Sequence, residues 1–259
     1  MKKMLFILVI NFITITNAFS YKFTSDFTNG FYWQNFPVKF DIIGSTNSEG
    51  QQLQQMVDYA KKEWEAIVGS QVWDFSLGYT TSASRATNSI RWSNNFAAET
   101  GFDPSVTLAI TTRYTNGTYV SKSDIILNGN SYQLRNDQGL LYRTILHEMG
   151  HVVGLDHTNA QAVMYPYITQ FTTPQQDDID GFNALIDETF SRQGTGYISP
   201  LSSEDLNNKY ANCGSIDLSD KNGPSNFIGS LLFGLLFMLV LKQLLKLRLI
   251  KGNNFLKAQ

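Results

Sequence analysis

The segment HEMGHVVGLDH, at positions 147 to 157, contains all three histidines of this 259-residue chain. Residues four apart on a helix project from one face about one turn apart, so His147 and His151 can reach a common point. Gly154 can end the helix in a left-handed conformation and let the chain turn back toward the same point with His157. The segment therefore requires a helix followed at once by a turn, and it predicts that three imidazoles converge.

Three neutral imidazoles form a ligand set suited to Zn²⁺, and three protein ligands leave one position for water, as in catalytic zinc sites. Glu148 adjoins the first histidine, where a carboxylate can accept a proton from that water during attack on a carbonyl. A single histidine is more often a hydrogen-bonded core residue, but this spacing favours a metal site. The prediction is one catalytic zinc bound by His147, His151 and His157, with Glu148 as the catalytic general base.

This segment, followed by AVMYP at positions 162 to 166, resembles the zinc signature and Met-turn of the metzincin metallopeptidases, most closely the matrixin branch. The similarity extends over roughly residues 30–186. WQNFPVKFDI resembles the first matrixin strand, VTLAITT the edge strand, SDIILN the next strand and TPQQDDIDGFNALI the last helix. The resemblance implies an α/β (α+β) fold with a twisted, mostly parallel five-stranded sheet, an antiparallel edge strand and three helices.

The same resemblance implies a zinc endopeptidase whose partners are extended polypeptide substrates. Met164 would form a hydrophobic floor below the metal, and substrate would lie antiparallel to the edge strand by β-augmentation. The residues that it assigns to substrate binding are Thr107, Leu108, Ala109, Ile110, Tyr165, Pro166 and Tyr167. One of Asp177 and Asp178 would also brace the Met-turn.

Several positions depart from the family pattern. Ile110 and Ile126 stand where many matrixins have ligands of a second, structural zinc, so we expect only one zinc per chain. Asp124 and Asn128 carry oxygen atoms suited to calcium, and solvated polar groups of a loop are the alternative interpretation. Ile168 stands where a tyrosine is expected, which leaves the side-chain preference of the substrate pocket open. The propeptide that keeps many matrixins latent has no counterpart before the domain.

Hydrophobic periodicity and turn residues predict the remaining elements. A strand is expected over Phe36–Gly44, a helix from a cap at Ser48, and further strands within residues 74–80 and 89–92. Asn116-Gly117 is typical of a tight turn and predicts a hairpin with arms Val106–Tyr114 and Tyr119–Asn128. Asn136 or Asp137 is expected to cap the helix that carries the first two histidines.

Both ends of the chain are basic and apolar. Residues 1–20 have the charge and apolar run of a signal peptide, with an uncleaved anchor as the alternative. Residues 227–250 are predicted to be a transmembrane or a processed sorting segment, followed by a short basic tail at 251–259. The peptidase domain is assigned to 21–190 and a polar linker to 191–226. Cys213 in that linker is either a free thiol or a lipidation or processing point.

The charge of the stretch between these ends excludes one class of partner. Residues 21–226 contain all 22 acidic residues but only 13 of the 20 basic ones, since seven lie in the ends. Their net charge of about −9 opposes binding to nucleic acid.

The two terminal segments lead us to expect an exported protein, either tethered to the membrane with its domain outside or secreted after processing. The competing hypothesis is a zinc-binding surface adhesion or interaction protein that has this fold without turnover.

Overall fold

The computed structural model describes residues 20–201 and 211–218, all of which fall within a single unit, Met1–Leu218. The predicted signal peptide, apart from Ser20, lies outside the described residues, as do the 227–250 segment and the basic tail. Within the described part of the chain, no helix combines the length and the apolar character needed to cross a bilayer.

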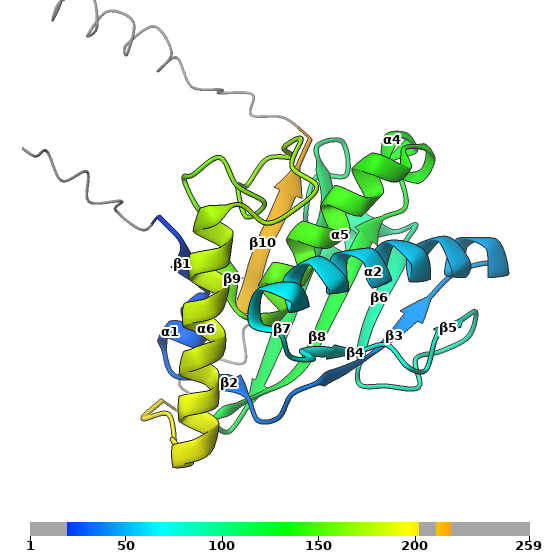
Figure 1. Ribbon diagram of the computed structural model, residues 1–259. Coiled ribbons are helices and arrows are strands. Elements are labelled where there is room, and N and C mark those ends of the chain that lie inside the picture. Colours follow the sequence, from blue (N-terminus) through cyan, green and yellow to red (C-terminus); the bar gives the residue numbers. More distant parts are fainter. Residues whose placement is uncertain (1–19, 202–210, 219–259) are drawn as a thin grey trace, which may run out of the picture. The chain divides into compact units, whose positions relative to one another are not determined.

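The centre of the fold is an eight-stranded sheet (Figure 1). Six strands follow in the spatial order β10 (Ala211–Asp217), β7 (Thr107–Asn116), β8 (Tyr119–Asn128), β6 (Asn88–Ser93), β3 (Val38–Ile43) and β4 (Trp73–Asp74). The short strands β2 (Tyr32–Trp33) and β5 (Tyr79–Thr80) pair with β8 and β3. Pairing is parallel except at β7, which is antiparallel to both β8 and β10.

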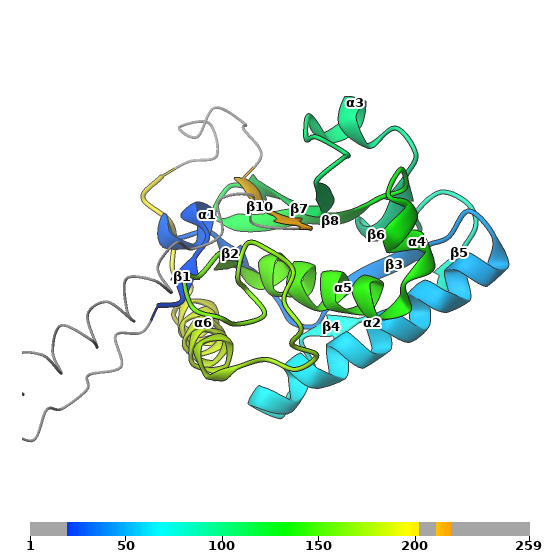
Figure 2. The same cartoon turned by 90° about the horizontal axis from the view of Figure 1, so that it is seen from above.

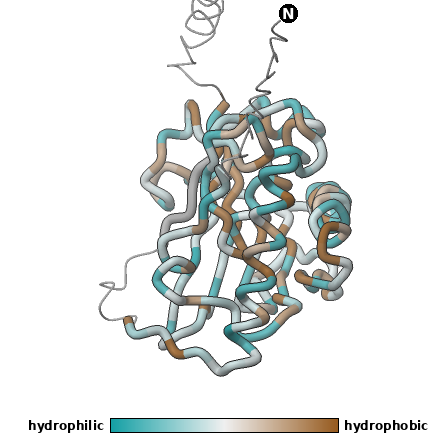
Figure 3. Tube along the Cα trace, turned by 60° about the vertical axis from the view of Figure 1, so that its left-hand side comes forward, coloured by the Kyte–Doolittle hydropathy of each residue, from teal (hydrophilic) through white to brown (hydrophobic). Residues whose placement is uncertain are grey.

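Three long helices lie on one side of strands β7 and β8, and a short one lies on the other side (Figure 2). The long helices are α2 (Asn47–Val68), α5 (Gln138–Val153) and α6 (Gln176–Thr195). The short helices are α1 (Ser25–Thr28), α3 (Phe96–Thr100), on the opposite side of the sheet, and α4 (Tyr132–Asn136). Hydrophobic and hydrophilic stretches alternate along the chain (Figure 3), as expected where one face of each element packs against the core.

Helix α2 packs against α5 and fixes its position. Its apolar side chains Leu53, Val57 and Trp64 are buried. The Trp64 indole also donates a hydrogen bond of 2.9 Å to the carbonyl of Leu146 in α5. The predicted cap at Ser48 is wrong, because the Thr46 hydroxyl accepts from the Glu49 backbone N–H and the helix begins two residues earlier than a cap at Ser48 would place it.

The predicted hairpin is confirmed. Strands β7 and β8 are joined by Gly117 and Thr118, one position later than predicted, and Gly117 has a φ of 59°, which glycine adopts without steric cost. The hairpin places β7 beside α5, the helix that carries the histidines, so β7 lies along the candidate site.

The predicted mixed α/β matrixin fold is confirmed, with more elements than the family pattern implies. The main sheet has eight strands instead of five, and the three short helices are additional. The predicted polar linker, residues 191–226, is structured in part. Helix α6 continues to Thr195 and ends at Gly196, whose φ is 62°. Residues 211–217 form β10, because the backbone groups of β7 offer hydrogen bonds that a polar segment can make.

Candidate metal centre

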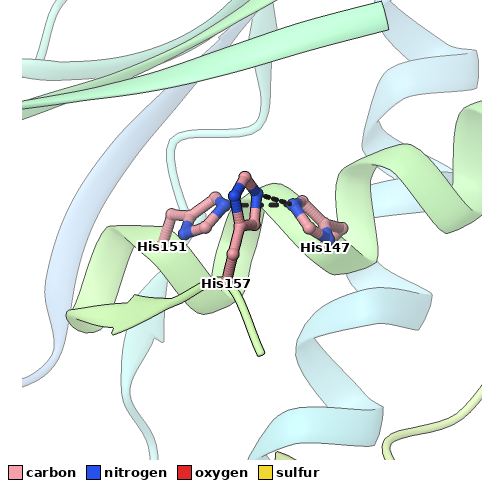
Figure 4. Close-up of side chains that lie close together, drawn as sticks. All are labelled: His147, His151 and His157. Carbon is pink, nitrogen blue, oxygen red and sulfur yellow. Dashed lines mark hydrogen bonds between the residues drawn. The ribbon is translucent and has the colours of Figure 1, made fainter. Parts of the chain in front are cut away.

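Helix α5 and the turn after it bring the three histidines together (Figure 4). The helix begins after Asp137, whose carboxylate accepts from the Leu140 N–H at 2.9 Å, as one of the two predicted caps. His147 and His151 lie one turn apart and are fully buried. Gly154 ends the helix with a φ of 125°, and the short strand β9 (Leu155–Asp156) leads to His157. One nitrogen atom of each imidazole lies within 4.8 Å of the others.

Hydrogen bonds to backbone carbonyls fix the tautomers of two of these rings. His147 Nδ1 lies 2.6 Å from the carbonyl oxygen of Val163, and His151 Nδ1 lies 2.7 Å from that of Leu155. A carbonyl oxygen can only accept, so each Nδ1 carries the hydrogen and each Nε2 presents a lone pair. This is the arrangement usual for metal-ligating histidines.

The distances between the Nε2 atoms fit a tetrahedral metal. His147 Nε2 lies 3.0 Å from His151 Nε2 and 3.3 Å from His157 Nε2. Two lone pairs at such distances repel unless a cation lies between them. Zinc–nitrogen bonds of about 2.0–2.1 Å place two tetrahedral ligands roughly 3.3 Å apart. The three residues therefore fit Zn²⁺ in geometry as well as in donor type.

The protonation of the histidines agrees with this role. Burial lowers the pKa of His147 to about 3, with a smaller contribution from His157. Burial also lowers the pKa of His151 well below its ordinary value, and it lowers the pKa of His157. All three rings are consequently neutral near pH 7, which is the form that binds a metal.

Glu148 is fully buried beside the histidines. The Thr111 hydroxyl on β7 donates a hydrogen bond of 2.6 Å to Glu148 Oε2, whereas Oε1 has no close hydrogen-bond partner among the described residues. Burial raises the pKa of Glu148 to about 8, against opposing contributions from the Thr111 hydroxyl and the Ile216 backbone N–H. A carboxylate with a raised pKa and one unpartnered oxygen is suited to accept a proton. The contact with Thr111 was not predicted.

The Met-turn is held by Asp178. Its carboxylate oxygens accept from the backbone N–H groups of Val163 and Met164 at 2.8 and 2.9 Å. Because the Val163 carbonyl orients His147, Asp178 supports the first histidine through the turn. Met164 itself is buried and abuts Gly150, where any Cβ would collide with the methionine sulfur. No local pattern indicated that Gly150 lies against Met164.

The predicted substrate-binding residues lie on two facing segments. Thr107, Leu108, Ala109 and Ile110 belong to β7, and Tyr165, Pro166 and Tyr167 follow the Met-turn. The prediction that β7 is an edge strand requires a correction, because β10 pairs with it in antiparallel orientation. The polar sequence of residues 211–217 did not suggest a strand, since edge pairing depends on backbone groups.

The two isoleucines that replace ligands of a second zinc in the family pattern are packed against each other in the structure. Ile110 and Ile126 are direct cross-strand partners and pack with Phe96 and Phe102 in a small apolar cluster. In the described ranges, the three histidines form the only group of His, Cys, Asp or Glu residues spaced for a shared metal.

The oxygen atoms considered for calcium have protein partners. Asp124 accepts from Ser89 and pairs with Lys122, and Asn128 Oδ1 accepts from the Asn130 N–H.

Comparison with known proteins agrees with this geometry. Residues 32–186 match the protein-family model described as Matrixin. The match covers more than half of the chain, runs from β2 into α6, and includes the three histidines and Glu148. No curated protein matches the chain.

Proposed function

The chain belongs to the matrixin family of zinc metallopeptidases, and on that premise we propose that it is an endopeptidase that hydrolyses extended polypeptides. The observation that carries the proposal is the convergence of three imidazole lone pairs beside a buried carboxylate. His147, His151 and His157 would hold Zn²⁺, and Glu148 would be the general base.

Bound zinc in such a site polarises a carbonyl and acidifies a water molecule. Glu148 accepts the proton of the attacking water at Oε1 and returns it to the leaving nitrogen. Thr111 orients this carboxylate through Oε2. Burial of Glu148 keeps competing water away from the proton that it carries.

The two walls of the cleft support an extended substrate. The strand β7 offers backbone groups on one side, and the segment that follows the Met-turn offers them on the other. A peptide between them is held by main-chain hydrogen bonds, and pockets for its side chains give selectivity. Folded proteins lack a free extended segment of this kind, so flexible polypeptides are the proposed substrates.

The proposed site of this activity is outside the cell. The sequence of residues 1–20 supports export, and residues 227–250 support either anchoring in the membrane or sorting before secretion. The competing function, a zinc-binding adhesion or interaction protein, has less support. Binding alone does not require a buried carboxylate beside the metal ligands, and burial of such a group costs stability.

A peptide library tests the proposal. The purified chain loaded with zinc should hydrolyse library peptides, and a chelator should abolish the hydrolysis until zinc is restored. Full zinc occupancy without cleavage of any peptide would favour the adhesion or interaction function.

A further inference from the structure

The strand β10 lies between the two walls just described and is bonded to both. It pairs with β7, with Ile216 opposite Ala109. On the other side, the Asp217 N–H donates to the Pro166 carbonyl at 3.1 Å, and the Ile168 N–H donates to the Asp217 carbonyl at 2.9 Å. The peptide-binding groups of both walls are therefore engaged by the protein's own chain.

The strand also passes the general base. The Ile216 N–H lies close enough to the Glu148 carboxylate to lower its pKa. The Ile216 side chain is 2% exposed and packs with the main hydrophobic core, which fixes this residue in place. The next residue but one, Leu218, donates its N–H to the Val106 carbonyl at 3.0 Å, so the pairing continues beyond Glu148.

This placement identifies one peptide bond. In peptide hydrolysis, the general base returns its proton to the nitrogen of the bond that breaks. Ile216 supplies the strand N–H that contributes to the pKa of Glu148, and the next residue, Asp217, is bonded to Pro166 and Ile168, so the bond presented to the site is Ser215–Ile216. Glu148 Oε1 remains without a close hydrogen-bond partner among the described residues and is available for the proton.

We propose that the protein cleaves its own chain, in cis, between Ser215 and Ile216. The inference rests on the proposed endopeptidase function. The oxygen of water bonds to the Ser215 carbonyl carbon, the bond from that carbon to the Ile216 nitrogen breaks, and Glu148 carries a proton from the water to that nitrogen. The products are a carboxylate at Ser215 and an amine at Ile216.

Cleavage would have two consequences. It separates the peptidase domain from residues 216–259, which include the apolar segment at 227–250. It also cuts the strand that occupies the cleft, because the new terminus at Ile216 is no longer covalently joined to the half of β10 that precedes it. Departure of residues 216–218 frees the backbone groups of Val106, Pro166 and Ile168 for other peptides, whereas residues 211–215 stay paired with β7.

The test uses the full chain, purified without metal and then supplied with Zn²⁺. Mass spectrometry should show a fragment that begins at Ile216, formed at a first-order rate that does not depend on protein concentration. Glu148→Ala should not form it. Ile216→Asp, which places a charge in a buried apolar position, should slow its formation by at least about tenfold. The matched control Ile198→Asp should leave the rate unchanged, because Ile198 is 75% exposed.

Hydrogen exchange supplies a readout that does not depend on turnover. In the Glu148→Ala chain, the amides of Asp217 and Leu218 should be protected, since both donate hydrogen bonds to the walls. Adding Ile216→Asp should abolish this protection, and adding Ile198→Asp should not.

The outcomes separate the inference from the proposed function. Hydrolysis of library peptides with the Ser215–Ile216 bond intact would overturn the inference alone. Faster peptide hydrolysis by Ile216→Asp without self-cleavage would identify β10 as an inhibitory strand, and a rate that rises with protein concentration would identify cleavage between molecules. Either result would overturn the inference. If neither peptides nor this bond were cut at full zinc occupancy, both would fail.

Discussion

The Thr111 hydroxyl lies 2.6 Å from Glu148 Oε2 and joins the strand β7 to the proposed general base on α5. The bond holds one oxygen of the carboxylate and lowers the pKa of Glu148, although burial raises that pKa more. The strand proposed to bind substrate is thereby connected directly to the residue proposed to transfer the proton.

We predict that Thr111→Val, which keeps the side-chain shape and removes the hydroxyl, raises the pKa of Glu148. The base is then protonated up to a higher pH, so the acid limb of the kcat/KM profile should move upward. The control is Thr112→Val, because adjacent strand residues point to opposite faces and the Thr112 hydroxyl contacts the Asp124 carbonyl instead. An unchanged acid limb in Thr111→Val would show that the hydroxyl does not tune the base.

Asp178→Asn should weaken zinc binding without removing a ligand. An amide has one acceptor oxygen where the carboxylate has two, so the N–H groups of Val163 and Met164 cannot both be satisfied as they are now. Loss of an outer-shell partner of this kind typically costs about 10–100-fold in metal affinity. Competition with a zinc chelator measures the affinity.

The matched control for this change is Asp187→Asn, which alters an exposed carboxylate on the same helix. It should retain the affinity of the unaltered protein. Equal zinc affinities for Asp178→Asn and Asp187→Asn would contradict the role given to the Met-turn in orienting His147.

Glu148 should also make the stability of the metal-free protein depend on pH. Burial raises its pKa from 4.5 to about 8. A group with a pKa raised on folding contributes most below its unfolded pKa, and this contribution is lost as the pH rises through the folded pKa. The free energy of unfolding should therefore fall between pH 4.5 and 8. The fall should be a few kcal/mol at most, because a pKa difference of one between the folded and unfolded states corresponds to about 1.4 kcal/mol.

Glu148→Gln isolates this effect, because glutamine does not titrate and the histidines titrate in both proteins. Urea denaturation at several pH values should show that the variant gains stability relative to the unaltered protein as the pH rises. A constant difference in stability across this range would mean that Glu148 is not buried as a carboxylic acid in the metal-free fold.

Short sequence patterns predicted the helix and turn features that depend only on neighbouring residues. The helix spacing of His147 and His151, the break at Gly154 and the turn at Gly117 each follow from the conformations that those residues permit. The site features that were missed depend on contacts between distant segments. Nothing near Thr111 in the sequence indicates that it faces Glu148, 37 positions later.

Strand β10 also depends on contacts between distant segments, and the sequence did not predict it. Its hydrogen bonds join backbone atoms, so the side chains of residues 211–217 need not follow an alternating pattern. The polar composition of that stretch therefore predicted a linker. The unpaired edge of β7, which would have revealed a place for a strand, is a property of the assembled sheet rather than of either segment alone.

The most direct measurement is made on one preparation of Glu148→Ala, in which bound zinc and peptide hydrolysis are determined together. The substitution removes the base and no metal ligand, so the protein should retain one zinc per chain. Its kcat/KM should fall by roughly 10²–10⁴-fold, the range for loss of a general base. A zinc-loaded Glu148→Ala protein that hydrolyses peptides at a rate near that of the unaltered protein would contradict the assignment of Glu148 and the mechanism built on it.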